Sequence, residues 1–469
     1  MRGSARSFAL FACLVTASFA HAETLDGALA RAYMANPNLA AGRAGVRAID
    51  ESVPQALAGL RPQVSGGAQL GVLDRRNVSD TMEITNNDPT TLAWVQSVQS
   101  GRAIPRTGVL SVEQPVFDGF KTQNATRSAQ SGVLAARQKL RLLEQRVLLE
   151  AVTAYMDVLR ESAAVRLQQN NVQVLTEQLR QTRERFQYGQ ITPTDVAQAE
   201  ARLAAGRADQ SAARAALEAR LGQYRQIIGE EPKRLAPAQP VDRLLPRTRE
   251  EAEEIALVEN PVVVAALHDA DAADLNIHVA EGDFMPKVSV LGNVFTQTDL
   301  DGRGNRSIGA SLVGKLSVPF YDGGLTPSRV RQAKEIAGQR RRDADAASAE
   351  VMALVRANWG AWLAAKTQVS AVETQIKAAE KALNGVREEA KAGQRTTIEI
   401  LNAQLELLNA RLALLTAQRD RVVASYAVLG AVGRLSAECL ALAVEIYDPS
   451  LHFEQVKDGW IFPNTPEGK

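Results

Sequence analysis

The chain has 469 residues, with 54 basic and 53 acidic side chains, 45% hydrophobic residues and only 5% aromatic ones. The near-neutral balance excludes a strongly basic nucleic-acid-binding protein, and two cysteines exclude a disulfide-rich scaffold or a four-cysteine zinc module. Low aromatic content, four histidines and the absence of any catalytic or metal-binding motif favour long helices over an enzyme core, so we expect no catalytic residues, cofactor or metal.

The N-terminus, residues 1–22, has the pattern of a secretory signal peptide. Two arginines precede an apolar run that ends at Ala20, and Ala20-His21-Ala22 fits a small-residue cleavage site. The run is shorter than the roughly 20 residues that a membrane-spanning helix needs. Cys13 leaves a lipoprotein alternative, but cleavage there would leave a very short apolar region. We therefore expect an exported protein that begins at Glu23 and has no helical anchor.

The first half predicts a helix over 24–58, followed by strands over about 62–73 and 107–116. In the first strand, Val64, Ala68 and Leu70 alternate with polar or small residues. Each strand has the length of about ten residues that crosses a membrane when tilted. The pattern alone also fits an ordinary surface hairpin, because such signals are weak in a single segment.

Two helices follow the strands. No proline occurs between Lys121 and Tyr188, and apolar residues recur there at alternating spacings of four and three, as in a coiled coil. Such a helix would be roughly 100 Å long. A second helix is expected over 194–228. Its small residues Ala197, Ala201, Ala204 and Ala208 correspond to leucines in the second half, so we expect closer helix packing in the first half.

The second half repeats the first. Asn36-Pro37 and Pro62 recur 224 residues later as Asn260-Pro261 and Pro286, whereas the segment 114–119 recurs 204 residues later as 318–323. About 20 extra residues therefore lie in the first half, between Pro62 and Pro115. The resulting division is a first repeat (23–229), a linker (230–248), a second repeat (249–436, strands about 286–297 and 307–319) and a tail (437–469).

Each repeat thus reads helix, strand, strand, long helix, helix, and one chain supplies four strands. Four strands cannot close a barrel, and an open sheet edge is not tolerated in lipid. Association of several copies would solve this problem. Three copies would supply twelve strands, within the range of bacterial outer-membrane barrels, although the sequence itself does not determine the number three.

Two segments between the paired helices carry a family resemblance: 185–196 (RFQYGQITPTDV) and 392–403 (AGQRTTIEILNA). With the strand-to-helix corners at 115–119 and 319–323, they make the chain resemble the TolC family of outer-membrane efflux and secretion channels. The resemblance implies a homotrimer with a twelve-stranded β-barrel in the outer-membrane lipid. It also implies an α-helical barrel extending into the periplasm, with a belt built from the linker and the tail.

The resemblance also implies partners and cargo. Such channels are passive ducts of tripartite export systems, which include a periplasmic adaptor (membrane fusion protein) and an inner-membrane ABC or RND-type transporter. Their cargo is drugs and small molecules or secreted proteins. The lack of a convincing lipoprotein signal favours the type I secretion-like branch. The alternative is a non-channel periplasmic coiled-coil structural or adaptor protein.

The helix tips hold the expected site residues. Gly189 and Gly393 are expected at positive φ. The helices that follow are expected to start with capping groups and acids, at Thr194-Asp195 in the first tip and at Thr397 with Glu399 in the second. The resemblance implies a latch between Arg395 and Asp195 and a constriction acid at Glu399. It also shows two departures: Asn402 stands where a second acid is expected, and Ala390 where a latch tyrosine is expected. The residues expected to dock the adaptor are Gly189, Gln190, Thr192, Gly393, Gln394 and Thr396.

Overall fold

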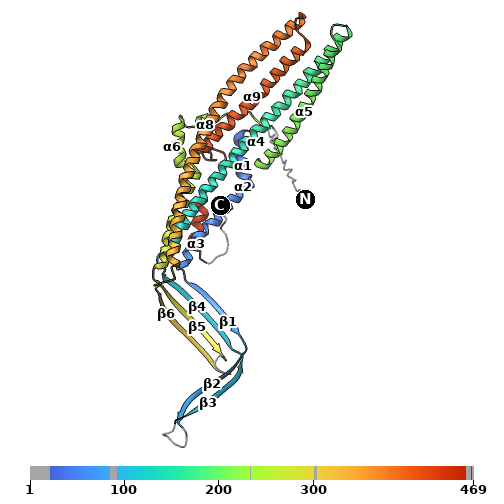
Figure 1. Ribbon diagram of the computed structural model, residues 1–469. Helices are drawn as coiled ribbons and strands as arrows, with labels where there is room; N and C mark the ends of the chain where they lie inside the picture. The colour runs from blue at the N-terminus through green and yellow to red at the C-terminus, as the bar shows by residue number, and fades with distance from the viewer. Residues whose placement is uncertain (1–21, 85–91, 233, 300–303, 461–465, 467–469) are drawn as a thin grey trace, which may run out of the picture. The chain divides into compact units, whose positions relative to one another are not determined.

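A computed structural model describes residues 22–84, 92–232, 234–299, 304–460 and 466 (Figure 1). Apart from Ala22, the expected signal peptide lies outside the described residues. The chain forms two compact units, each assembled from three segments. Unit 1 contains the chain up to residue 40 together with 143–256 and 353–446, and unit 2 contains 41–142, 257–352 and the chain from 447 onward. Both repeats contribute to both units, so the compact units do not coincide with the repeats.

The single helix expected over 24–58 is wrong, because the chain there forms three helices: α1 (Leu25–Ala35), α2 (Pro37–Asp50) and α3 (Ser52–Leu57). Pro37 has no backbone N–H and cannot continue α1. Asn36 instead starts the next helix, since its Oδ1 accepts a hydrogen bond from the backbone N–H of Asn38 at 2.9 Å. The same Asn-Pro pair separates α6 (Arg249–Glu259) from α7 (Pro261–Glu281) in the second half.

Two helical hairpins supply most of unit 1, although the first turns of their long helices belong to unit 2 (Figure 1). The first consists of α4 (Lys121–Gln187) and α5 (Pro193–Ile228), and the second of α8 (Leu325–Lys391) and α9 (Thr397–Val432). Near the tips, a buried cluster joins α4, α5 and α9; its members are Leu175, Leu179, Ala199, Leu203 and Leu401. None of the helices in the described part of the chain is both long and apolar enough to cross a membrane.

The alanine face of α5 that the sequence predicts to pack closely is not the face that contacts α4. Ala197, Ala201, Ala204 and Ala208 are exposed in this chain. Contact with α4 instead occurs at Gly206, where an added Cβ would lie 2.8 Å from Leu175 Cδ1. The correspondence with the leucines of α9 therefore does not identify the buried face of α5.

Unit 2 contains an antiparallel four-stranded sheet in the order β1-β4-β5-β6. Its strands are β1 (Gln63–Leu70), β4 (Arg106–Phe117), β5 (Lys287–Thr298) and β6 (Arg306–Ser317). The register of β4 against β5 shifts between Pro115 and Phe117, where Pro115 lacks the N–H that a regular ladder uses. Because β1 and β6 are the edges, both ends of the sheet are open in a single chain.

The extra residues of the first half form a further hairpin that the sequence did not predict as strands. Strands β2 (Leu73–Ile84) and β3 (Leu92–Ala103) pair with each other and extend beyond the four-stranded sheet (Figure 1). Charged and polar residues such as Arg75, Asp80 and Gln96 interrupt the alternation, which removes the usual sequence signal of a half-buried strand.

The linker and the tail are each attached by polar contacts within a unit. In unit 1, Glu23 and Leu235 form a parallel bridge, and the Tyr155 hydroxyl lies 2.8 Å from the Glu23 carbonyl oxygen and 2.7 Å from that of Ala236. In unit 2, the tail helix α10 (Pro449–Val456) places His452 Nδ1 2.9 Å from Asp50 Oδ2. Both side chains of this pair are buried.

Candidate functional site at the helix tips

The first tip is the turn between α4 and α5. Gly189 has φ +71°, a conformation that glycine adopts without steric cost. Thr192 is the N-cap of α5, since its Oγ1 accepts from the Asp195 N–H at 3.3 Å while Asp195 Oδ2 accepts from the Thr192 N–H at 3.0 Å. The expected cap at Thr194 is therefore wrong: Pro193 is favoured at the first helical position and moves the cap two residues earlier.

The second tip has the same construction. Gly393 has φ +79°, and the N-cap of α9 is Thr396 rather than Thr397. Glu399 Oε2 accepts from the Thr396 backbone N–H at 2.7 Å. This hydrogen bond and the neighbouring Arg395 guanidinium lower the pKa of Glu399 to about 2. Glu399 is thus ionised at neutral pH.

Arg395 pairs within its own tip in this chain. Its Nε lies 2.8 Å from Glu389 Oε2 and its Nη1 2.7 Å from Glu399 Oε1. The structure therefore brings Arg395 to Glu399 and does not bring it to Asp195. Glu389 was missed by the sequence reasoning, although a signal was present: the first repeat has Arg185 and Ile191 at the positions of Glu389 and Arg395. The pair is consequently a feature of the second tip alone.

Asn402, which stands where the second acid is expected, has a hydrogen-bond partner that the sequence did not predict. Arg202 on α5 donates from Nη2 to Asn402 Oδ1 on α9 at 2.8 Å. A cation thus lies next to the position where the family resemblance implies a carboxylate. The signal available in the sequence was the charge reversal between Arg202 and its repeat equivalent, Glu406.

The tips also present an accessible polar surface. All six residues expected to dock an adaptor are exposed in this chain: Gly189, Gln190, Thr192, Gly393, Gln394 and Thr396. In the described residues, no group of three His, Cys, Asp or Glu side chains is placed to hold a metal ion.

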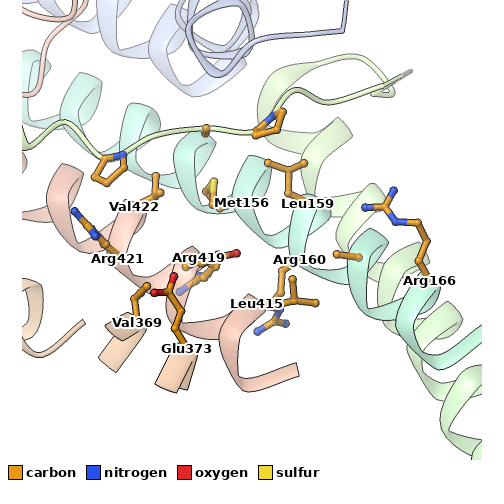
Figure 2. A pocket seen from close by; sticks show the side chains of 15 residues that line it. Met156, Leu159, Arg160, Arg166, Val369, Glu373, Leu415, Arg419, Arg421 and Val422 are labelled. Atoms are coloured by element: carbon orange, nitrogen blue, oxygen red, sulfur yellow. The ribbon is translucent and has the colours of Figure 1, made fainter. Parts of the chain in front are cut away.

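A second feature of unit 1 lies beside the linker, away from the tips. A cavity of about 530 Å³ lies between the linker and helices α4, α8 and α9. Figure 2 shows Met156, Leu159 and Leu415 among its walls. Two of the arginines that line it are paired with acids: Arg419 Nε lies 2.7 Å from Asp157 Oδ1, and Arg421 Nη2 lies 3.1 Å from Asp242 Oδ2. The cavity is therefore lined by both apolar side chains and arginines.

Comparison with known proteins identifies the family to which this chain belongs. The family described as "Outer membrane efflux protein" matches residues 28–230 and 254–434. The chain belongs to this family. It is 36% identical to the outer membrane efflux protein BepC of Brucella suis over 97% of this chain and 95% of that protein. It is also 26% identical to the outer membrane protein TolC of Escherichia coli, over 96% of this chain and 90% of that protein.

A solved structure shares the fold. The CmeC outer membrane channel of Campylobacter jejuni aligns with a TM-score of 0.74 at 16% identity, covering 92% of this chain and 89% of that chain. The resemblance to the TolC family is thus confirmed, and the family match confirms an export function at the outer membrane. The two matched segments of the family are separated by residues 231–253.

Proposed function

We propose that three copies of this chain form a channel, with a twelve-stranded barrel in the outer membrane and a helical tunnel in the periplasm. The observation that carries this proposal is the two-faced sheet of unit 2. On one face, paired residues of successive strands are apolar or small, as in Val64, Val112, Gly292 and Leu312. Leu312 is 79% exposed in the single chain. An apolar face of this extent is unfavourable in water and favourable against lipid.

The other face of the sheet is mainly polar. It carries Ser65, Ser111, Asn293 and Ser311 at paired positions of the four strands. In a closed barrel, this face would line a water-filled lumen. The open edges at β1 and β6 leave unpaired backbone groups that lipid cannot satisfy, so closure requires further copies. Twelve strands from three copies meet this requirement.

The duct is passive and needs partners for energy. We propose a periplasmic adaptor that contacts the exposed tips and an inner-membrane ABC or RND-type transporter. Drugs and other small molecules are the first candidate cargo, and the efflux named in the descriptions of the family and of BepC is compatible with them. Secreted proteins, the cargo of the type I branch favoured by the sequence, are the second candidate. Export assays with the partner transporter and each cargo class separate the two.

We propose that the tips gate the tunnel. In the single chain, Arg395 is held by Glu389 and Glu399, and its side chain is 46% exposed. Asp195 lies at the corresponding turn of the first hairpin, where it caps α5. In the closed trimer, Arg395 would exchange one of its local carboxylates for Asp195. This exchange of one charged partner for another is a small electrostatic change, and it suits a latch that must open.

Single-channel conductance in a planar bilayer tests the gate. We expect small, steady openings for the unmodified channel and larger ones for Arg395→Ser, because the substitution removes the latch cation. Lys391→Ser is the matched control, since Lys391 is an exposed cation of the same tip that pairs only locally with Glu388 at 2.7 Å. Equal conductance in all three proteins would refute the latch while leaving the channel intact. No conductance from folded protein would favour the non-channel alternative, as would recovery from the soluble periplasmic fraction.

A further inference from the structure

The two strand-to-helix corners of unit 2 have the same conformation. We call residues 115–121 the first corner and 319–325 the second corner. Gly119 and Gly323 have φ values of +74° and +72°. Asp118 accepts from the Thr122 N–H at 2.8 Å, and Asp322 accepts from the Thr326 N–H at 2.7 Å. The two corners are thus structural copies whose surroundings can be compared directly.

The first corner is packed against the turn η3 (Gly282–Phe284), which precedes β5. A Cβ added to Gly119 would lie 2.5 Å from the Gly282 carbonyl oxygen and 2.6 Å from Met285 Cβ. Lys121 Nζ also lies 3.0 Å from Asp283 Oδ1. Glycine at 119 is therefore needed both for its positive φ and for this close approach.

The second corner has no such neighbour within the described chain. A Cβ added to Gly323 or Gly324 would meet no atom within 4 Å. Phe320 and Tyr321 are 93% and 87% exposed. The repeat counterpart of η3 is the turn η1 (Ala58–Leu60), which precedes the edge strand β1. All three residues of η1 are exposed, whereas Gly282 of η3 is buried.

We propose that the second corner of one copy packs on η1 of the next copy, reproducing between chains the contact that the first corner makes with η3 within a chain. This inference rests on the proposed assembly of several copies and adds the residues that join them. The strand pairing follows from the repeat. Since Val112 pairs with Gly292 and Glu113 with Leu291, we expect Leu316 opposite Ala68 and Ser317 opposite Gly67 of the next copy.

The faces of the strands support this register independently. Leu316 pairs with Val288 on the apolar face of the sheet, and Ala68 pairs with Gly108 on the same face. The expected pairing therefore continues the apolar face across the junction. A slip of one residue would put apolar side chains opposite the polar face, because successive side chains of a strand point to opposite sides.

The junction between copies differs chemically from the one within the chain. Leu325 and Gly59 occupy the positions of Lys121 and Asp283, so the ion pair has no counterpart between copies. Leu325 is 52% exposed and Leu60 37% exposed in the single chain. We therefore expect an apolar contact that high salt does not weaken. Ala58 carries a Cβ where Gly282 has none, which makes this contact wider than the internal one.

Disulfide cross-linking of the outer-membrane-assembled protein tests the register. The design pairs Ser317→Cys with Gly67→Cys in a Cys439→Ser background. Directly opposed residues of antiparallel strands have Cα atoms about 4.5–5.5 Å apart, which a disulfide spans. Gly67 has an open environment and tolerates the added side chain. We expect loss of the monomer band and a ladder of covalent dimers and trimers on a non-reducing gel.

Three controls make the result specific. Glu113→Cys with Leu291→Cys is the equivalent internal pair and should close within one chain, leaving the mass unchanged. Two further variants should leave monomers. In Ser317→Cys with Ala68→Cys the two side chains point to opposite faces of the sheet, and Ser317→Cys alone has no partner thiol. If light scattering shows trimers in detergent but only an out-of-register cysteine pair forms the disulfide, the inference would be overturned. Monomers by light scattering would overturn the proposed assembly itself, and the inference with it.

Discussion

At the tips, single side chains determine the electrostatics. Arg202 donates to Asn402 at 2.8 Å, and Arg395 contacts Glu389 and Glu399 at 2.8 and 2.7 Å. Glu399 is held ionised by the Thr396 N–H and by Arg395, which lower its pKa to about 2. Glu399 therefore remains charged at the expected constriction. The position expected to hold a second acid carries the neutral amide of Asn402, next to the cation of Arg202.

This arrangement predicts a non-additive effect on ion selectivity. Asn402→Asp alone should change cation preference little, because Arg202 would pair with the new carboxylate. The double substitution Asn402→Asp with Arg202→Gln should raise cation preference clearly. Reversal potentials in a salt gradient measure both. A large shift from Asn402→Asp alone would show that Arg202 does not neutralise this position in the assembled channel.

At the scale of the helices, close approach is concentrated at one glycine of α5. Gly206 is buried against Leu175 of α4, and its repeat equivalent Ala410 is also buried. Gly222 lies on the same helix, and a Cβ added there would meet no atom within 4 Å. Substitutions at these two glycines therefore distinguish the effect of helix propensity from the effect of packing.

Substitution by valine should affect these glycines differently. Gly206→Val should destabilise the hairpin by about 1–3 kcal/mol, because the added atoms collide with Leu175. Gly222→Val should be nearly neutral, since valine is a slightly better helix former than glycine by a few tenths of a kcal/mol. Thermal unfolding followed by far-UV circular dichroism compares the two. Equal loss in both variants would contradict a packing role for Gly206.

At the scale of the whole molecule, contacts between residues distant in sequence attach the tail. His452 of α10 reaches Asp50 of α2, and the Arg137 guanidinium lies 5.2 Å from the centre of the Phe453 ring. Desolvation raises the pKa of Asp50 against the opposing effects of His452, Arg137 and Arg47. The hydrogen bond with His452 thus opposes the effect of burial on this carboxyl.

Removing that partner should release the tail. His452→Ala should cost about 1–3 kcal/mol, the usual loss when a buried polar group is left without its hydrogen-bond partner. Without the imidazole, the carboxyl of Asp50 has a still higher pKa, so the loss should grow as the pH rises and shrink in acid. Limited proteolysis of a C-terminally tagged chain at pH 5 and pH 8 measures it. Unchanged protection at both values would show that the rest of α10 suffices.

The sequence by itself determined the family, the two long helices, the four strands of the main sheet and the turn glycines. These features depend on local periodicity, on glycine and proline geometry, and on the internal repeat, all of which act over short separations. Only the tertiary structure decided the β2–β3 hairpin, the buried face of α5 and the partners of Arg395 and Asn402. Those features depend on which elements meet in space, and a carboxylate or an arginine on an exposed helix face has no sequence signal for the side chain it will contact.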